Sequence, residues 1–312
     1  MDISVVSLKD GRLLVGRGAK RYLDKPDLEM PSWYTPDFFL RDELPWHVHE
    51  SYEVVEKFDF PQREMYLGEM ESFRERYETM KLEKGVVYTR CQVLGFDPFS
   101  ALSRLNSGHI YATDKIIGAT PEILFDLNST GLTTMALAST AEKVSDLEGE
   151  KEQEEHEIVV RSIFEALSPF GLLEKGERSA LPYGNLFHLQ TPIQLTGQIS
   201  FEEAVQALHP TAAVGAWPKT AGKKWLLEQE QHLPRKRYGA PFGYIFPERN
   251  EARAFVAIRC VQWDDQGAYL WAGAGITSKS SYEKERAEIQ KKLEATASMM
   301  GENSFSKFPP IL

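Results

Sequence analysis

The stretch from Ala252 to Met300 decides the fold. It reads ARAFVAIRCVQW at 252–263 and AYLWAGAGITSKSSYEKERAEIQKKLEATASMM at 268–300. The first segment alternates apolar with other residues, which predicts a half-buried strand that contains Arg259. A second strand is expected to follow and to end in a glycine-rich turn. The capping-box pattern Ser280 to Glu283 then predicts the start of a helix.

Three kinds of binding group fall within this predicted strand-turn-helix unit. They are the Arg259 guanidinium, the backbone amides of Gly273, Ala274 and Gly275, and the carboxylates of Glu285 and Glu288. The two glutamates are three residues apart and therefore share one face of the helix. Arginine and free amides suit a carboxylate ligand, and paired carboxylates suit a hard divalent cation. Together they indicate a site for an anionic small molecule held through a metal.

Ordinary structural roles would also explain each of these residues. A buried arginine can pair with a structural acid, glycines after a strand commonly form a turn, and helical glutamates are usually solvated. Residue types alone therefore leave both interpretations open.

Composition limits the classes of partner. The chain has 312 residues, of which 42% are hydrophobic and 26% charged, and a net charge of −10. This acidity argues against nucleic acid and anionic membranes as partners. Cys91 and Cys260 are not in a metal-ligand spacing, so free thiols in a reducing compartment are expected. We find neither a signal-peptide pattern nor an apolar run of roughly 18 residues, and we predict a cytoplasmic protein.

The remaining elements are predicted from periodicity and turn residues. Asp10-Gly11 indicates a hairpin, and the segment 109–127 suggests a strand pair that encloses GATPE. A helix through Leu167 can begin its buried stripe at Glu155. Further predictions are an amphipathic helix at Pro61–Leu82, strands at 86–93, 132–140, 186–197 and 238–246, and a short helix at Phe201–Leu208.

Eight ordered motifs resemble the chorismate-utilising enzymes, a family that includes isochorismate, salicylate and anthranilate synthases. The motifs are GATPEILF, ALAST, EEHEIVV, FHLQTPI, ALHPTAAVGAWPK, RYGAPFGYI, FVAIRC and WAGAGITSKSSYEKERAEIQKK. The LHPTAAV segment is most similar to the isochorismate and salicylate synthase branch. Ala138 stands where the aminodeoxychorismate branch often has a nucleophilic lysine. The chain contains no glutaminase domain, although a separate glutaminase subunit stays possible.

The resemblance implies roles for individual residues. Glu122 matches the general acid that protonates the leaving C4 hydroxyl of chorismate. Glu155 and Glu288 match the carboxylates that bind Mg2+, and Glu285 lies one helical turn away. Arg259 and Tyr238 match residues that hold a substrate carboxylate.

Other matches concern the walls of the implied site. Gly273, Ala274 and Gly275 match the turn whose amides approach the ligand. His188 matches a histidine near the ring-bearing end of the site, and Thr140 belongs to the AST turn.

Two positions depart from the family pattern. The lysine that activates water in isochorismate synthases aligns with Gly85, while Lys84 stands one residue earlier. Strand alternation would point Lys84 to the other face unless a bulge at Gly85 redirected it. Met135 stands where the isochorismate branch commonly has a glutamate. The identity of the general base, Lys84 or another group, is therefore open.

The resemblance implies an α+β fold with large, mostly antiparallel sheets and helices packed outside. We expect a single chorismate-binding domain over residues 1–312 with a shortened N-terminal region, present as a monomer or weak homo-oligomer. The expected function is Mg2+-dependent isomerisation of chorismate to isochorismate. The alternatives are an aminodeoxychorismate or anthranilate synthase component I-like enzyme, and a degenerate, non-catalytic chorismate-binding protein.

Overall fold

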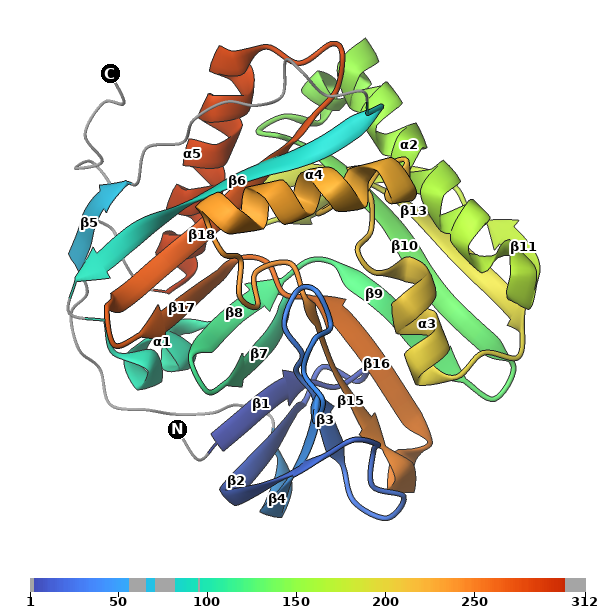
Figure 1. The fold of residues 1–312 in the computed structure, drawn as a ribbon, viewed down its shortest axis with the longest axis vertical. Helices are drawn as coiled ribbons and strands as arrows, with labels where there is room; N and C mark the ends of the chain where they lie inside the picture. Colours follow the sequence, from blue (N-terminus) through green and yellow to red (C-terminus); the bar gives the residue numbers. More distant parts are fainter. Residues whose placement is uncertain (1–2, 56–65, 71–81, 95, 301–312) are drawn as a thin grey trace.

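The computed structural model describes residues 3–55, 66–70, 82–94 and 96–300. Antiparallel strands dominate these residues, with helices around them (Figure 1). The strands are β1 Ile3–Ser7, β2 Leu13–Leu23, β3 Ser32–Tyr34, β4 Trp46–Val55, β5 Tyr66–Met70, β6 Lys84–Leu94, β7 His109–Thr113, β8 Ile116–Thr120, β9 Ile123–Asn128, β10 Gly131–Ala141, β11 Gly171–Lys175, β12 Ser179–Tyr183, β13 Leu186–Gly197, β14 Ala216–Trp217, β15 Pro241–Phe246, β16 Glu251–Val256, β17 Cys260–Asp264 and β18 Gly267–Ile276. The α-helices are α1 Pro98–Arg104, α2 Glu150–Leu167, α3 Phe201–Leu208, α4 Lys219–His232 and α5 Tyr282–Met299.

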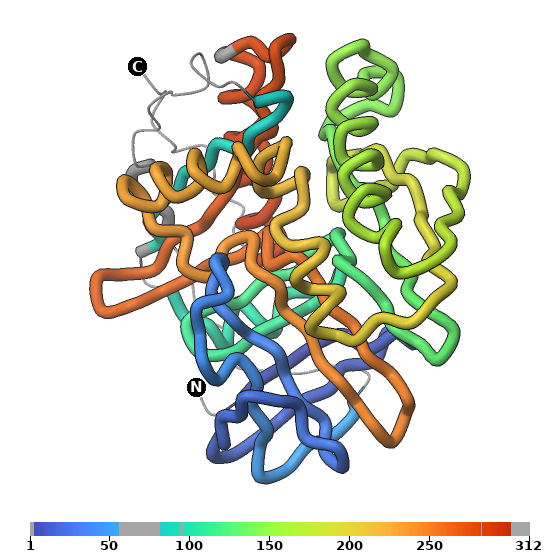
Figure 2. The backbone as a smooth tube through the Cα atoms, turned by 45° about the vertical axis from the view of Figure 1, so that its right-hand side comes forward, coloured from blue at the N-terminus to red at the C-terminus, as the bar shows by residue number. Residues whose placement is uncertain are grey.

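The strands form one antiparallel hydrogen-bonded network. Its pairs run β5-β6-β18-β17-β8-β7-β1-β2-β4-β3-β15-β16-β9-β10-β13, and both β11 and β12 add to β13. In Figure 2 the blue N-terminal strands lie at the bottom of the molecule, whereas the green and red helical segments rise at the top. The predicted α+β fold with large antiparallel sheets is confirmed.

Helices α2 and α5 position acidic side chains above the sheet. Helix α2 packs on β10 and α5 packs on β18. Val159, Ile163 and Leu167 recur at helical spacing on the buried face of α2, and Glu155 lies one turn before them on the same stripe. Burial of this apolar stripe therefore carries a carboxylate into the interior.

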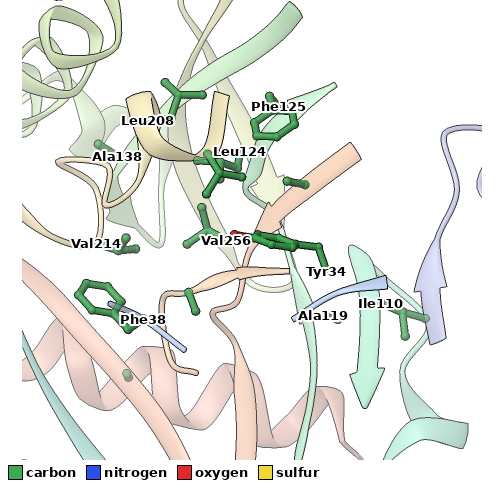
Figure 3. Close-up of a cluster of buried hydrophobic side chains, with 14 of the residues drawn as sticks. Tyr34, Phe38, Ile110, Ala119, Leu124, Phe125, Ala138, Leu208, Val214 and Val256 are labelled. Atoms are coloured by element: carbon green, nitrogen blue, oxygen red, sulfur yellow. The ribbon is translucent and has the colours of Figure 1, made fainter. Parts of the chain in front are cut away.

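The apolar core extends to the wall of the cavity described below. Figure 3 shows part of it, with Phe125, Leu124 and Leu208 above Tyr34 and Val256. All five are buried. Two further members of the cluster, Ala138 and Val214, line the cavity described below. The core therefore fixes part of the cavity wall directly.

Several predicted elements are confirmed. Strands β1 and β2 pair across the predicted hairpin at Asp10-Gly11. Strand β13 spans residues 186–197 as predicted, and α3 begins at Phe201 and ends at Leu208. Along the described ranges, none of the helices combines the length and hydropathy that a membrane crossing requires.

The predicted helix at Pro61–Leu82 is wrong where it can be compared. Residues Tyr66–Met70 form β5, whose backbone pairs with β6 at Leu67↔Val93 and Met70↔Cys91. Ladder hydrogen bonds to an available strand edge outweigh a helical spacing of apolar residues here. Residues 61–65 and 71–81 of that prediction lie outside the described residues.

The single strand predicted at 252–263 is divided into β16 and β17. The chain turns after Val256, where Ile258 N donates to Val256 O at 2.8 Å. Arg259 then adopts a φ of 57°, in the left-handed region. This conformation is uncommon for a residue with a side chain, and it ends the regular alternation. The residue that the pattern placed inside a strand lies instead at a sharp change of direction.

The predicted turn at Gly273, Ala274 and Gly275 is also wrong. These residues continue β18, and Gly275 pairs with Val86 of β6. The helix cap is shifted by one residue, because Ser281 rather than Ser280 caps α5 by accepting from Lys284 N. Ser280 instead accepts a hydrogen bond from Thr277 N at 3.1 Å.

Candidate active site

A cavity opens between β6, β10, β13 and β18, with an empty volume of about 610 Å³ including its mouth. One wall is apolar and includes Val86, Leu137, Val214, Ile258 and Trp271. The polar lining residues are Glu122, Ser139, Thr140, Glu155, His188, Tyr238, Arg259 and Lys292. An apolar cleft with a few convergent polar groups is the usual form of a small-molecule site.

Glu122 is a buried acid on this cavity. It lies in the turn between β8 and β9, and its backbone N donates to Thr120 Oγ1 at 3.1 Å. Its exposed fraction is 4%. Burial raises the pKa of Glu122 to about 7, although the ammonium groups of Lys84 and Lys292 act in the opposite direction. A carboxyl group with this pKa holds its proton at neutral pH far more than an exposed glutamate does.

Arg259 presents a buried guanidinium that has no acidic partner. It is 4% exposed, and in the described part of the chain no carboxylate lies within ion-pair distance of it. Its Nη2 donates to His188 Nε2 at 3.3 Å. Pairing with a structural acid of the described chain therefore does not explain Arg259, and a buried guanidinium whose neighbours here are a neutral imidazole and a backbone carbonyl favours an anionic ligand.

His188 is held in one orientation beside Arg259. Its Nδ1 lies 3.2 Å from the Ser139 carbonyl oxygen and 3.2 Å from Thr140 Oγ1. Since a carbonyl only accepts, Nδ1 carries the hydrogen and Nε2 is free to accept from Arg259. Burial and the Arg259 charge hold the pKa of His188 well below its usual range. The imidazole is therefore neutral and orients the guanidinium.

Tyr238 closes the opposite side of the cavity. Its ring stacks on Trp271 with a centroid separation of 5.6 Å, and both side chains are buried. Burial raises the pKa of the Tyr238 phenol, which therefore stays protonated and can donate a hydrogen bond.

Lys84 points into the site, contrary to the expectation that alternation would turn it away. Its side chain is 1% exposed, and its Nζ lies 3.1 Å from Glu155 Oε1. Val86 lines the cavity, and Lys84 precedes it by two residues, so both side chains share one face of β6. The β6–β18 ladder runs without a register shift, so no bulge in it is needed.

Gly275 makes room for this ion pair. A Cβ at residue 275 would collide with the Glu155 carboxylate and with Lys84 Cε. Gly273 lines the cavity as well, whereas Ala274 is buried outside its lining, on the other face of β18. Two of the three predicted residues therefore reach the site, through the alternation of a strand rather than through a turn.

The three predicted metal carboxylates meet around Lys151. Its Nζ lies 3.1 Å from Glu155 Oε2, 3.1 Å from Glu285 Oε1 and 3.9 Å from Glu288 Oε2. Although burial alone would raise it, Lys84 and Lys151 lower the pKa of Glu155 to about 2. Burial, followed by the neighbouring Glu288 carboxylate, raises the pKa of Glu285 to about 7.

The donor set fits Mg2+ in its chemistry. Carboxylate oxygens from α2 and α5 are the hard ligands that this ion takes in proteins. The described residues nevertheless contain no ready-made group of three acidic, histidine or cysteine ligands. The position between the three carboxylates is instead taken by the Lys151 ammonium.

Sequence reasoning missed two lysines at this site. Lys151 lies in the acidic run 145–157, which was interpreted as mostly solvated. Lys292 lines the cavity, where its Nζ donates to Gly273 O at 2.9 Å and to Glu288 Oε1 at 2.6 Å. Its position four residues after Glu288 on one helix face was the signal that could have identified it.

The family model described as "Chorismate binding enzyme" matches residues 103–301. The chain belongs to this family. Salicylate biosynthesis isochorismate synthase of Pseudomonas aeruginosa is 31% identical over 231 residues, which cover 66% of this chain and 48% of that protein. Isochorismate synthase MenF of Bacillus subtilis is 26% identical over 307 residues, or 92% of this chain and 64% of that protein. The chain thus spans about half to two thirds of the length of these curated relatives.

Solved structures support the fold of the family. MenF, the menaquinone-specific isochorismate synthase from Escherichia coli, superposes with a TM-score of 0.75 at 18% identity. The match covers 96% of this chain and 88% of that structure. The family resemblance inferred from the eight motifs is confirmed.

Proposed function

We propose that this chorismate-binding enzyme converts chorismate to isochorismate and depends on Mg2+. The observation that carries the proposal is that a buried acid with a raised pKa and a guanidinium without an acidic partner among the described residues line one cavity, with a buried lysine next to it. Glu122, Arg259 and Glu155 line that cavity. Lys84 is not part of its lining but contacts Glu155. The similarity to isochorismate synthases supports the choice of substrate.

The proposed reaction exchanges one hydroxyl group for another. A water molecule adds its oxygen to C2, the ring double bonds shift, and the C4 hydroxyl leaves as water with the proton of Glu122. Lys84, which contacts Glu155, is the proposed acceptor of the proton that the attacking water loses. One water enters and one leaves, so the product is an isomer of the substrate.

The other polar and charged residues of the site are proposed to bind the substrate and the metal. Arg259 and Tyr238 hold one carboxylate of the substrate, since they offer donors that point into the cavity and have no carboxylate partner there. Glu155, Glu285 and Glu288 would hold Mg2+, which when bound supplies positive charge to a second carboxylate. The apolar wall formed by Leu137, Ile258 and Trp271 would exclude bulk water from the ring.

Ala138 counts against the aminodeoxychorismate synthase-like alternative. This residue lines the cavity, and its methyl group supplies no nucleophile at the position where a lysine would be needed. The degenerate binding protein remains as an outcome of the experiment below.

The test combines product analysis with binding. Purified protein is incubated with chorismate and Mg2+, and products are resolved by chromatography and mass spectrometry. We expect isochorismate, no turnover in EDTA, and loss of turnover in Lys84→Met, which should still gain thermal stability from chorismate. Stabilisation of the wild type by unchanged chorismate would instead establish a non-catalytic binding protein, and aminated products with ammonium would establish the aminating enzyme.

A further inference from the structure

Lys151 occupies the centre of the carboxylate cluster. Its ammonium bridges Glu155 of α2 and Glu285 of α5, at 3.1 Å from an oxygen of each. The side chains of Glu155, Glu285 and Glu288 are 5%, 3% and 13% exposed, and that of Lys151 is 16% exposed. The cluster is therefore largely withdrawn from water, which strengthens both attraction and repulsion within it.

The cluster requires a cation. Three carboxylates in such a small, poorly hydrated space would repel one another strongly without positive charge between them. The Lys151 ammonium lies 3.1 Å from an oxygen of Glu155, 3.1 Å from one of Glu285 and 3.9 Å from one of Glu288, so it joins α2 to α5.

We propose that Lys151 is an internal counter-ion that competes with the divalent cation for these three carboxylates. The proposal rests on the metal dependence of the proposed function and not on turnover. One ammonium and one divalent ion cannot share the same oxygens at contact distance, so metal entry requires Lys151 to leave.

The structure provides space for this displacement. A separate cavity adjoins the cluster and is lined by Lys151 together with Asp146 and Glu152. The same lining includes Lys279, Lys284 and Lys291, so the displaced ammonium would enter a space of mixed charge. Together with Lys84 on Glu155 and Lys292 on Glu288, Lys151 offsets the negative charge of the metal-free cluster, and it weakens the binding of the metal by the free energy needed to move it.

The experiment measures binding of Mn2+, a hard divalent probe, by the electron paramagnetic resonance signal of the free ion. Lys151→Met keeps a side chain of similar length without charge, and we expect it to bind Mn2+ at least about tenfold more tightly than wild type. Lys279→Met is the matched control. Lys279 pairs with Glu154 at 3.0 Å near the same end of α2 but does not contact the cluster. This control should match wild type.

A second measurement applies if Lys151→Met is unstable without metal. The variant is purified with Mn2+, and its melting temperature is compared in Mn2+ and in EDTA. We expect a larger difference for Lys151→Met than for wild type, because the metal replaces the missing ammonium. Equal or weaker Mn2+ binding by the variant, or an equal melting shift, overturns the inference. Neither result depends on chorismate turnover, so the proposed function stands or falls separately.

Discussion

Replacing Glu122 with glutamine removes the one buried acid whose proton the proposed reaction uses. Its pKa is raised from the ordinary 4.5 to about 7 in the folded protein, chiefly by burial. Between these two values the unfolded chain has lost the proton while the folded chain still holds it. Raising the pH therefore favours unfolding, and the stability contributed by the neutral carboxyl is lost as pH rises toward 7.

The size of the effect follows from the difference of about 2.5 between the two pKa values. Each pKa unit corresponds to about 1.4 kcal/mol. The wild type should therefore lose about 3 kcal/mol of unfolding free energy between pH 4.5 and 8, whereas Glu122→Gln should keep it. The assay is urea unfolding over this pH range, with the difference between variant and wild type plotted against pH. Exposed Glu157 of α2 provides the control variant Glu157→Gln, for which the plot should be flat. A flat plot for Glu122→Gln would show that the buried carboxyl is ionised throughout, and the proposed acid role would fail with it.

Two further substitutions test the binding groups and the space between them. Arg259→Lys should raise the KM for chorismate about tenfold or more, because an ammonium cannot donate two parallel hydrogen bonds to a carboxylate, and an unchanged KM would exclude Arg259 from substrate binding. Gly275→Ala places a Cβ against the Glu155 carboxylate and Lys84 Cε, so we expect a loss of about 1–3 kcal/mol in urea unfolding. Gly176→Ala, whose Cβ would make only ordinary contacts with Pro192, should change stability little, and equal effects at the two positions would contradict the steric argument.

The antiparallel architecture and most of the site were predicted from the resemblance to a known family, which eight local motifs carry. Glu122, His188 and Arg259 line one cavity, as the family resemblance implied. Strand phase was harder to predict. Alternation was expected to turn Lys84 to the other face unless a bulge redirected it, yet Lys84 contacts Glu155 with no register shift in the β6–β18 ladder. With a period of two, the face depends on a single residue of phase.

Tertiary contacts explain the other differences. Gly273 and Gly275 indicated a turn, but glycine is equally required where β18 passes close to Glu155, and only the packed structure distinguishes the two. Lys151 was hidden in an acidic run whose charges suggested solvation. Its importance arises from Glu285 on a helix far away in the sequence, which no local pattern reports.

Five groups of the site come from five different segments of the chain. Lys84 comes from β6, Glu155 from α2 and His188 from β13, while Glu122 and Arg259 come from connections between strands. Until these distant segments pack together during folding, no part of the site is formed. Because such long-range pairings are slow to form, recovery of turnover after dilution from denaturant should lag behind recovery of helical signal. Under the proposed function, turnover would thus be a stringent reporter that the whole topology has been reached.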